Sequence, residues 1–187
     1  MNRYLPLGLI IGLLIAFRIL GSVLPSTQPN FQPLVALFFC GALLAGGWRG
    51  FAIPFGIWAV TYPLAQGPVW DPAIFFVTLI ALSATFFLGK TLSNRGFPVV
   101  LVGSILAAVV FHLITNVAAW IGDPTYQKSL TGLWQSLWTG PPSSSLPSWV
   151  FLRNLAAANL LFTGIFAGAQ LRLPKSKTFT RQPVLAK

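Results

Sequence analysis

Residues 98–121 decide the fold: they read PVVLVGSILAAVVFHLITNVAAWI and contain no charged residue. At a rise of about 1.5 Å per residue, a helix over this stretch would be about 36 Å long, enough to cross a bilayer core of about 30 Å. A soluble helix of this length would carry a polar stripe along one side, and this stretch has none. The stretch is therefore predicted to be a transmembrane helix.

Three polar residues of this helix, Ser104, His112 and Asn116, are four or eight positions apart and so share one helical face. His112 is also the only histidine in the chain. Because polar side chains inside a membrane are costly and usually serve a function, His112 and Asn116 are candidate ligand-binding residues.

The composition of the whole chain is that of an integral membrane protein. Of its 187 residues 55% are hydrophobic and only 7% are charged, whereas soluble domains carry roughly 25% charged residues. The net charge of +10 does not indicate nucleic-acid binding, because the basic residues are spread over short loops and a tail instead of forming one patch. The single cysteine, Cys40, excludes an internal disulfide.

Apolar runs predict six transmembrane helices in an all-α protein. Besides 98–121, the predicted spans are residues 5–24, 31–47, 51–66, 72–92 and 149–171. Trp48-Arg49-Gly50 is interpreted as a tight turn between the second and third spans. The spans form one domain, residues 1–171, followed by a basic cytoplasmic tail, residues 172–187.

The connection between the fifth and sixth spans, residues 122–148, is predicted to contain a short helix lying in the membrane interface. One helical face of its first half gathers large apolar and aromatic residues, a pattern typical of interfacial helices: Tyr126, Leu130, Leu133, Trp134, Leu137 and Trp138.

Charge distribution predicts the orientation. With six spans, nine basic residues share the side of both termini: Arg3, Arg49, Lys90, Arg95, Arg172, Lys175, Lys177, Arg181 and Lys187. The opposite loops hold Lys128 and the two acidic residues, Asp71 and Asp123. Since basic loops stay in the cytoplasm, both termini are predicted to be cytoplasmic.

The sequence argues against an enzyme. Acid–base and metal chemistry need carboxylates or several histidines, but both aspartates fall in outer loops and there is one histidine. We therefore expect no metal and no cofactor.

Several polar residues are instead predicted to lie at one depth in the outer half of the membrane: Arg18, His112, Asn116, Arg153 and Asn159. This convergence predicts a ligand pocket, and the two arginines favour a polar or anionic ligand because guanidinium matches carboxylate geometry. Alternatively, the arginines extend to the outer interface and the amides cross-link helices.

The first span carries small residues at four-residue spacing, Gly8, Gly12 and Ala16. Such a stripe lets helix backbones approach closely in lipid, so it could receive a helix of a partner protein. Packing against another span of the same chain would explain it equally well.

Several short motifs resemble those of an uncharacterised bacterial family of six-span membrane proteins. They are Asn30-Phe31-Gln32-Pro33, residues 111–116 (FHLITN) with Trp120, residues 129–133 (SLTGL), Arg153-Asn154 and residues 159–163 (NLLFT). The resemblance covers about residues 29–168. That family is similar to the substrate-binding (S) components of energy-coupling factor transporters, which capture vitamins and similar micronutrients.

The resemblance implies a six-helix bundle in the bacterial inner membrane that binds a small molecule near its outer face. The first outer loop, residues 25–33 with Asn30, would act as a lid. Gly8, Gly12 and Ala16 would dock onto a transmembrane coupling protein that works with ATPase subunits. The family pattern has aspartate where this chain has Asn159, a difference that would alter the ligand if this position contacts it.

The sequence therefore predicts a non-enzymatic substrate-capture subunit of a micronutrient or vitamin uptake transporter. The alternative is a structural or assembly subunit of a larger membrane complex. A capture subunit requires a polar cavity near the outer face, whereas a structural subunit predicts a filled interior and a large apolar contact surface.

Overall fold

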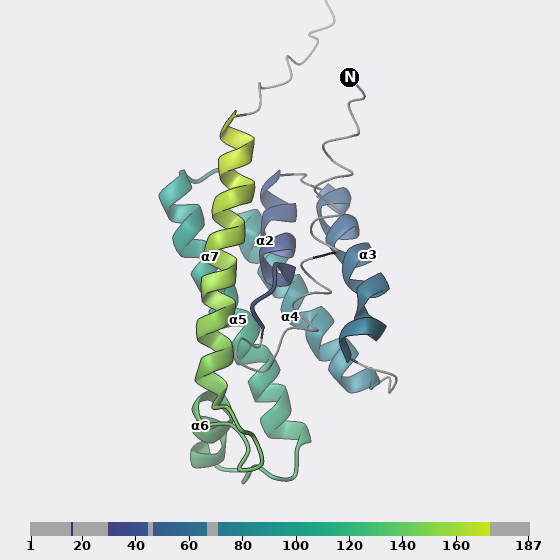
Figure 1. Cartoon of the computed structure of the whole chain (residues 1–187), viewed down its shortest axis with the longest axis vertical. Helices are drawn as coiled ribbons and strands as arrows, with labels where there is room; N and C mark the ends of the chain where they lie inside the picture. Colours follow the sequence, from purple (N-terminus) through teal and green to yellow (C-terminus); the bar gives the residue numbers. More distant parts are fainter. Residues whose placement is uncertain (1–15, 17–29, 45–46, 67–70, 173–187) are drawn as a thin grey trace, which may run out of the picture.

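The computed structural model describes residues 16, 30–44, 47–66 and 71–172. Every element in this part of the chain is an α-helix (Figure 1). The helices are α2 (Leu34–Leu44), α3 (Gly47–Gln66), α4 (Pro72–Thr91), α5 (Phe97–Gly122), α6 (Leu130–Trp138) and α7 (Ser148–Arg172).

The five longer helices form a bundle in which helices that follow one another in the chain run in opposite directions (Figure 1). Helix α2 packs against α3, α4, α5 and α7, and α5 packs against both α4 and α7. The short helix α6 lies at the end of the bundle where α5 finishes and α7 begins (Figure 1). We call this the α6 end; α4 also begins there, because Asp71 lies beside Gly122 and Asp123.

Local capping explains where the helices at the α6 end begin and finish. The Asp71 carboxylate accepts hydrogen bonds from the backbone N–H groups of Ala73 and Ile74 at the start of α4. Ser129 caps α6 in the same way through the N–H of Gly132. At the last turn of α5, the Lys128 ammonium donates to backbone carbonyls of Trp120 and Asp123, groups that have no partner within the helix.

Helix α2 forms the centre of the core. Eight of its residues are buried, as expected for a helix that is apolar on all sides. Phe38 packs edge-on against Phe51, which packs in the same way against Phe86, with ring centroids 5.4 and 5.3 Å apart. Trp58 stacks on Phe75 at 4.7 Å. Helices α3 and α4 are thus joined to α2 by interlocking aromatic rings.

Glycine lets the backbones of the core helices touch. A Cβ at Gly41 would overlap the carbonyl oxygen of Gly50, and one at Gly50 would overlap that of Gly41. A Cβ at Gly89 of α4 would likewise overlap the carbonyl oxygen of Phe39. These crossings require glycine because any side chain would push the helices apart.

Three helices are long and apolar enough to cross a membrane: α4, α5 and α7, the last over Ser148–Gly168. Large apolar side chains such as Ile80, Val102 and Ile165 are exposed on them, as expected for surfaces that face lipid. The all-helical class is therefore confirmed, and the three apolar helices suggest a membrane protein. The other predicted spans differ from these three. Helix α2 has only 11 residues, and α3 is not among the helices that are long and apolar enough to cross a membrane. Residues 5–24 lie outside the described part of the chain, except for Ala16.

The predicted turn at Trp48-Arg49-Gly50 is wrong, because these residues form the first turn of α3. Helix α3 opens earlier, at Gly47, whose φ of +53° is a conformation that glycine adopts without strain. The boundaries of α4, α5 and α7 agree with the predicted spans to within one residue.

Charges separate along the bundle. Three basic residues lie at the end opposite α6: Arg49 at the start of α3, Lys90 in the last turn of α4 and Arg95 in the turn that follows α4. Asp71, Asp123 and Lys128 lie at the α6 end. Among the described residues, the two ends therefore differ in charge as the sequence predicts.

Candidate functional site

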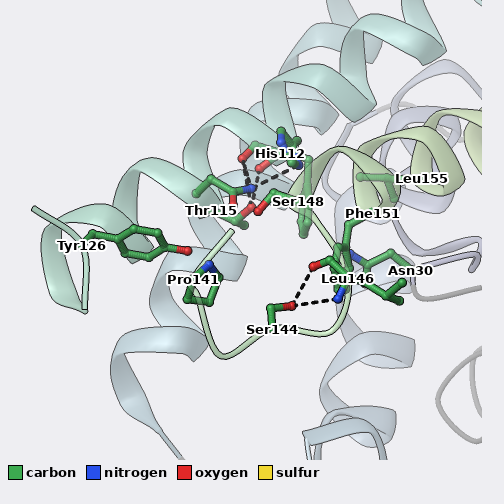
Figure 2. Close-up of a pocket in the computed structure, with 12 residues that line it drawn as sticks. Asn30, His112, Thr115, Tyr126, Pro141, Ser144, Leu146, Ser148, Phe151 and Leu155 are labelled. Carbon is green, nitrogen blue, oxygen red and sulfur yellow. Dashed lines mark hydrogen bonds between the residues drawn. The ribbon is translucent and has the colours of Figure 1, made fainter. Parts of the chain in front are cut away.

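A cavity of about 250 Å³ lies at the α6 end, between α5 and α7 (Figure 2). One wall is α5, with Phe111, His112, Thr115 and Asn116. The facing wall is the start of α7, and two loops complete the lining, with Asn30 contributed from the segment before α2. We call this space the α6-end cavity.

His112 connects the cavity to α6. The side chain is buried, with its Nε2 atom 2.9 Å from the carbonyl oxygen of Leu137 and its Nδ1 atom 3.1 Å from Asn116 Nδ2. Asn116 Nδ2 also donates to the backbone carbonyl of His112, at 2.9 Å. The predicted placement of His112 and Asn116 on one helical face is thus confirmed, and both residues line the cavity.

Helix α6 packs against α5 with its small and polar face inward. Ser136 is buried and its hydroxyl donates to the backbone carbonyl of Asn116 at 3.2 Å. Leu130, Trp134 and Trp138 are exposed on the outer side, as in a helix whose apolar side meets the membrane interface. The predicted short helix is confirmed, but Tyr126 does not belong to its exposed face, because it precedes α6 and is buried.

Tyr126 instead lines the cavity from the loop after α5 (Figure 2). Burial, reinforced by the negative charge of Asp123, raises the pKa of the Tyr126 hydroxyl, which therefore stays protonated at neutral pH. The pKa of Asp123 is lowered by hydrogen bonds from the backbone and side chain of Thr125. A neutral hydroxyl thus faces the cavity, while the carboxylate beside it is held by its own loop.

Asn30 lines the α6-end cavity and a second cavity of about 210 Å³. Its φ of +61° is a left-handed conformation that asparagine tolerates better than most residues. The second cavity shares Phe111, Thr115 and Leu155 with the first and adds Gln32 and Trp58. Asn30, which was predicted to belong to a lid over the ligand pocket, therefore lies between two adjoining cavities.

Comparison with known proteins assigns the chain to a group. A family model described as a family of unknown function, DUF6580, matches residues 1–181. The chain belongs to this family. No curated protein and no solved structure matches the chain. Any function of this DUF6580 protein must therefore be argued from its own residues.

Arg153 of the DUF6580 chain was predicted to share the cavity, and this prediction is wrong. Its side chain is exposed, its guanidinium carbon lies 5.3 Å from the centroid of the Trp149 ring, and it also donates to Asn154. The reason is helical geometry. Phe151 and Leu155 face the cavity, and a residue midway between two such positions points to the opposite side of the helix.

Asn159 was also predicted to contact the ligand, but it lies outside the cavity lining. Its side chain is fully buried between α7 and α5, where its Nδ2 donates to the backbone carbonyl of Ser104 at 3.0 Å. Its Oδ1 has no hydrogen-bond partner among the described residues. Asn159 therefore acts as a helix cross-link, the alternative that the sequence left open.

Three of the predicted positions, Arg18, Gly8 and Gly12, lie outside the described residues. Ala16 is described and is helical and exposed. Sequence reasoning missed several residues that line the two cavities, among them Tyr126, Gln32 and Trp58. Gln32 belongs to the Asn30–Pro33 motif, which was a usable signal; Trp58 carried no signal, because nothing in an apolar span marks which face borders a cavity.

Proposed function

We propose that this DUF6580 protein is a membrane substrate-capture subunit of a micronutrient uptake transporter, similar to an S component. The observation that carries the proposal is the α6-end cavity. Polar side chains of α5, the Tyr126 loop and Asn30 converge there in a bundle whose core is mainly apolar. Polar groups in a membrane protein are costly to keep, so a cluster of them around a hollow favours binding of a polar molecule.

In this proposal the chain forms a six-span bundle in the bacterial inner membrane with both termini in the cytoplasm. The first span, residues 5–24, completes the helices seen here. The basic residues opposite α6 support this orientation, since Arg49, Lys90 and Arg95 would face the cytoplasm. The α6-end cavity then opens toward the outer face, where a capture subunit meets its substrate.

The cavity favours capture over the two other functions. A structural subunit would favour a filled interior, whereas here a hollow borders His112 and Asn116. An enzyme would use a carboxylate or a second histidine near the reacting atoms, and no carboxylate lines the cavity among the described residues. We therefore propose a protein that binds and releases its ligand unchanged.

The proposed coupling partner is a transmembrane protein that works with ATPase subunits. Gly8, Gly12 and Ala16 would receive one of its helices, and the exposure of Ala16 supports this role. Gly12→Leu should fill the stripe and abolish uptake while the isolated subunit still binds ligand. If uptake survives this change, the docking part of the proposal is wrong.

The test of capture is mass spectrometry of small molecules released when the purified full-length protein is denatured. Wild type should release one molecule in near-stoichiometric amount, and Asn116→Ala should release far less. Asn159→Ala is the matched control, because it removes an amide outside the cavity. If wild type releases nothing, or the two variants retain equal amounts, the capture proposal fails.

A further inference from the structure

Two backbone carbonyls determine how hydrogens are arranged around His112. The carbonyl of Leu137 can only accept, so His112 Nε2, 2.9 Å away, must carry a hydrogen. The carbonyl of His112 can also only accept, so the atom of Asn116 that lies 2.9 Å from it is the amide nitrogen. That nitrogen is a donor too, and it lies 3.1 Å from His112 Nδ1, which must therefore accept.

Histidine can satisfy both contacts only as the neutral Nε2–H tautomer. In this state the Asn116 amide is held with its nitrogen against α5. No group of the described residues donates a hydrogen bond to Asn116 Oδ1, and Asn116 lines the cavity. His112 is thus a positioning residue that keeps the Asn116 carbonyl available as an acceptor.

The remaining lining is also uncharged. No aspartate, glutamate, lysine or arginine of the described residues lines the α6-end cavity. Arg153 faces away from it, and the Lys128 ammonium is engaged by carbonyls of Trp120 and Asp123. Asp123 lies close enough to Tyr126 to raise the pKa of its hydroxyl, so the negative charge of Asp123 would repel an anion. A charged ligand would be desolvated here without a counter-ion, which is strongly unfavourable.

From this geometry we infer that the ligand is an uncharged molecule that donates an N–H or O–H group to Asn116 Oδ1, as a neutral amide or lactam does. The inference rests on the proposed capture function and narrows its substrate class. The cavity, at about 250 Å³, is smaller than the roughly 300–1,000 Å³ of sites for drug-sized ligands, so the ligand is small.

Three probes of nearly identical shape test the charge: benzamide, the anion benzoate and the cation benzamidinium. Each is titrated against the purified full-length protein, freed of bound molecules, with thermal unfolding as the readout. Benzamide should raise the unfolding temperature and the two ions should not. His112→Leu and Asn116→Leu should each weaken benzamide binding about tenfold or more, the effect of leaving a buried polar group unpaired. Asn159→Ala is the control outside the cavity.

Rescue by glutamine tests the positioning role. In His112→Gln the side-chain amide offers one donor to Leu137 and one acceptor to Asn116, so it should restore much of the response lost in His112→Leu.

If benzoate or benzamidinium stabilises the protein instead, or the molecule released on denaturation is an ion, the uncharged class is wrong while capture stands. An equal response of wild type, His112→Leu and Asn116→Leu overturns the positioning role. If no probe binds and nothing is released, both proposals are wrong.

Discussion

The packed centre around α2 and the α6 end differ in how their buried hydroxyl groups are bonded. In the centre, buried hydroxyls bond within their own helix, as Thr61 does to Ile57 and Thr85 to Leu82, and helices meet at glycine. At the α6 end, polar groups bond between elements, as His112 does to Leu137 and Ser136 to Asn116, and a hollow remains. We therefore expect stability to depend mainly on the centre, and the proposed ligand binding to depend on the α6 end.

The largest effect is expected at the glycine crossings of the centre. Gly89→Ala places a Cβ on the carbonyl oxygen of Phe39, so the helices must separate, at a cost of about 3 kcal/mol in the free energy of unfolding. Gly56→Ala is the matched control, because nothing lies within 4 Å of a Cβ there. Thermal unfolding in detergent measures both variants; equal unfolding temperatures would show that the α2–α4 crossing does not limit stability.

Substitution of the two amides, Asn159 in the centre and Asn116 at the α6 end, should affect different quantities: the free energy of unfolding for Asn159 and the amount of bound ligand for Asn116. Asn159→Ala removes the hydrogen bond to Ser104 and should lower the free energy of unfolding by about 1 kcal/mol, the scale of such bonds between membrane helices. It should leave the amount of co-purified ligand unchanged, as quantified by mass spectrometry. Loss of ligand with unchanged stability would place Asn159 in the binding site and break the comparison.

Substitution of Arg153 tests where the proposed ligand site at the α6 end stops. Arg153→Ala removes the contact with the Trp149 ring and should cost about 0.5–1 kcal/mol, typical of an exposed cation–π pair. Ligand retention should not change, because the side chain points away from the cavity. A fall in ligand retention without a fall in unfolding temperature would show that the arginine reaches the ligand after all.

The smallest effect is expected in the loop beside the cavity. Hydrogen bonds from Thr125 lower the pKa of Asp123 below its ordinary 3.8, so the folded loop binds protons less readily than the unfolded chain. Their stabilising contribution is therefore present above about pH 3.8 and is lost as the pH falls through the lower folded value. The protection of the Thr125 amide against hydrogen exchange, relative to the unfolded chain at the same pH, should fall over that range. Asp123→Asn should abolish this pH dependence; if it does not, another group titrates.

Much of the α6 end could be predicted because its signals are local. The apolar length of residues 98–121 and the four-residue spacing of His112 and Asn116 determine a long helix with both side chains on one face. The short helix after it follows from the spacing of its leucines and tryptophans. These features depend on residues within a few turns of one another.

The sequence by itself thus determined the all-helical class, the extents of α4, α5 and α7, and the placement of His112 and Asn116 on one helical face. Only the tertiary structure decided that Arg153 faces outward, that Asn159 cross-links α5 and α7, and that Tyr126 lines the cavity. The physical reason is that spacing along a helix gives the depth of a residue in the membrane. The direction in which its side chain points relative to the bundle depends on which faces the neighbouring helices cover, and that is settled by packing between distant segments.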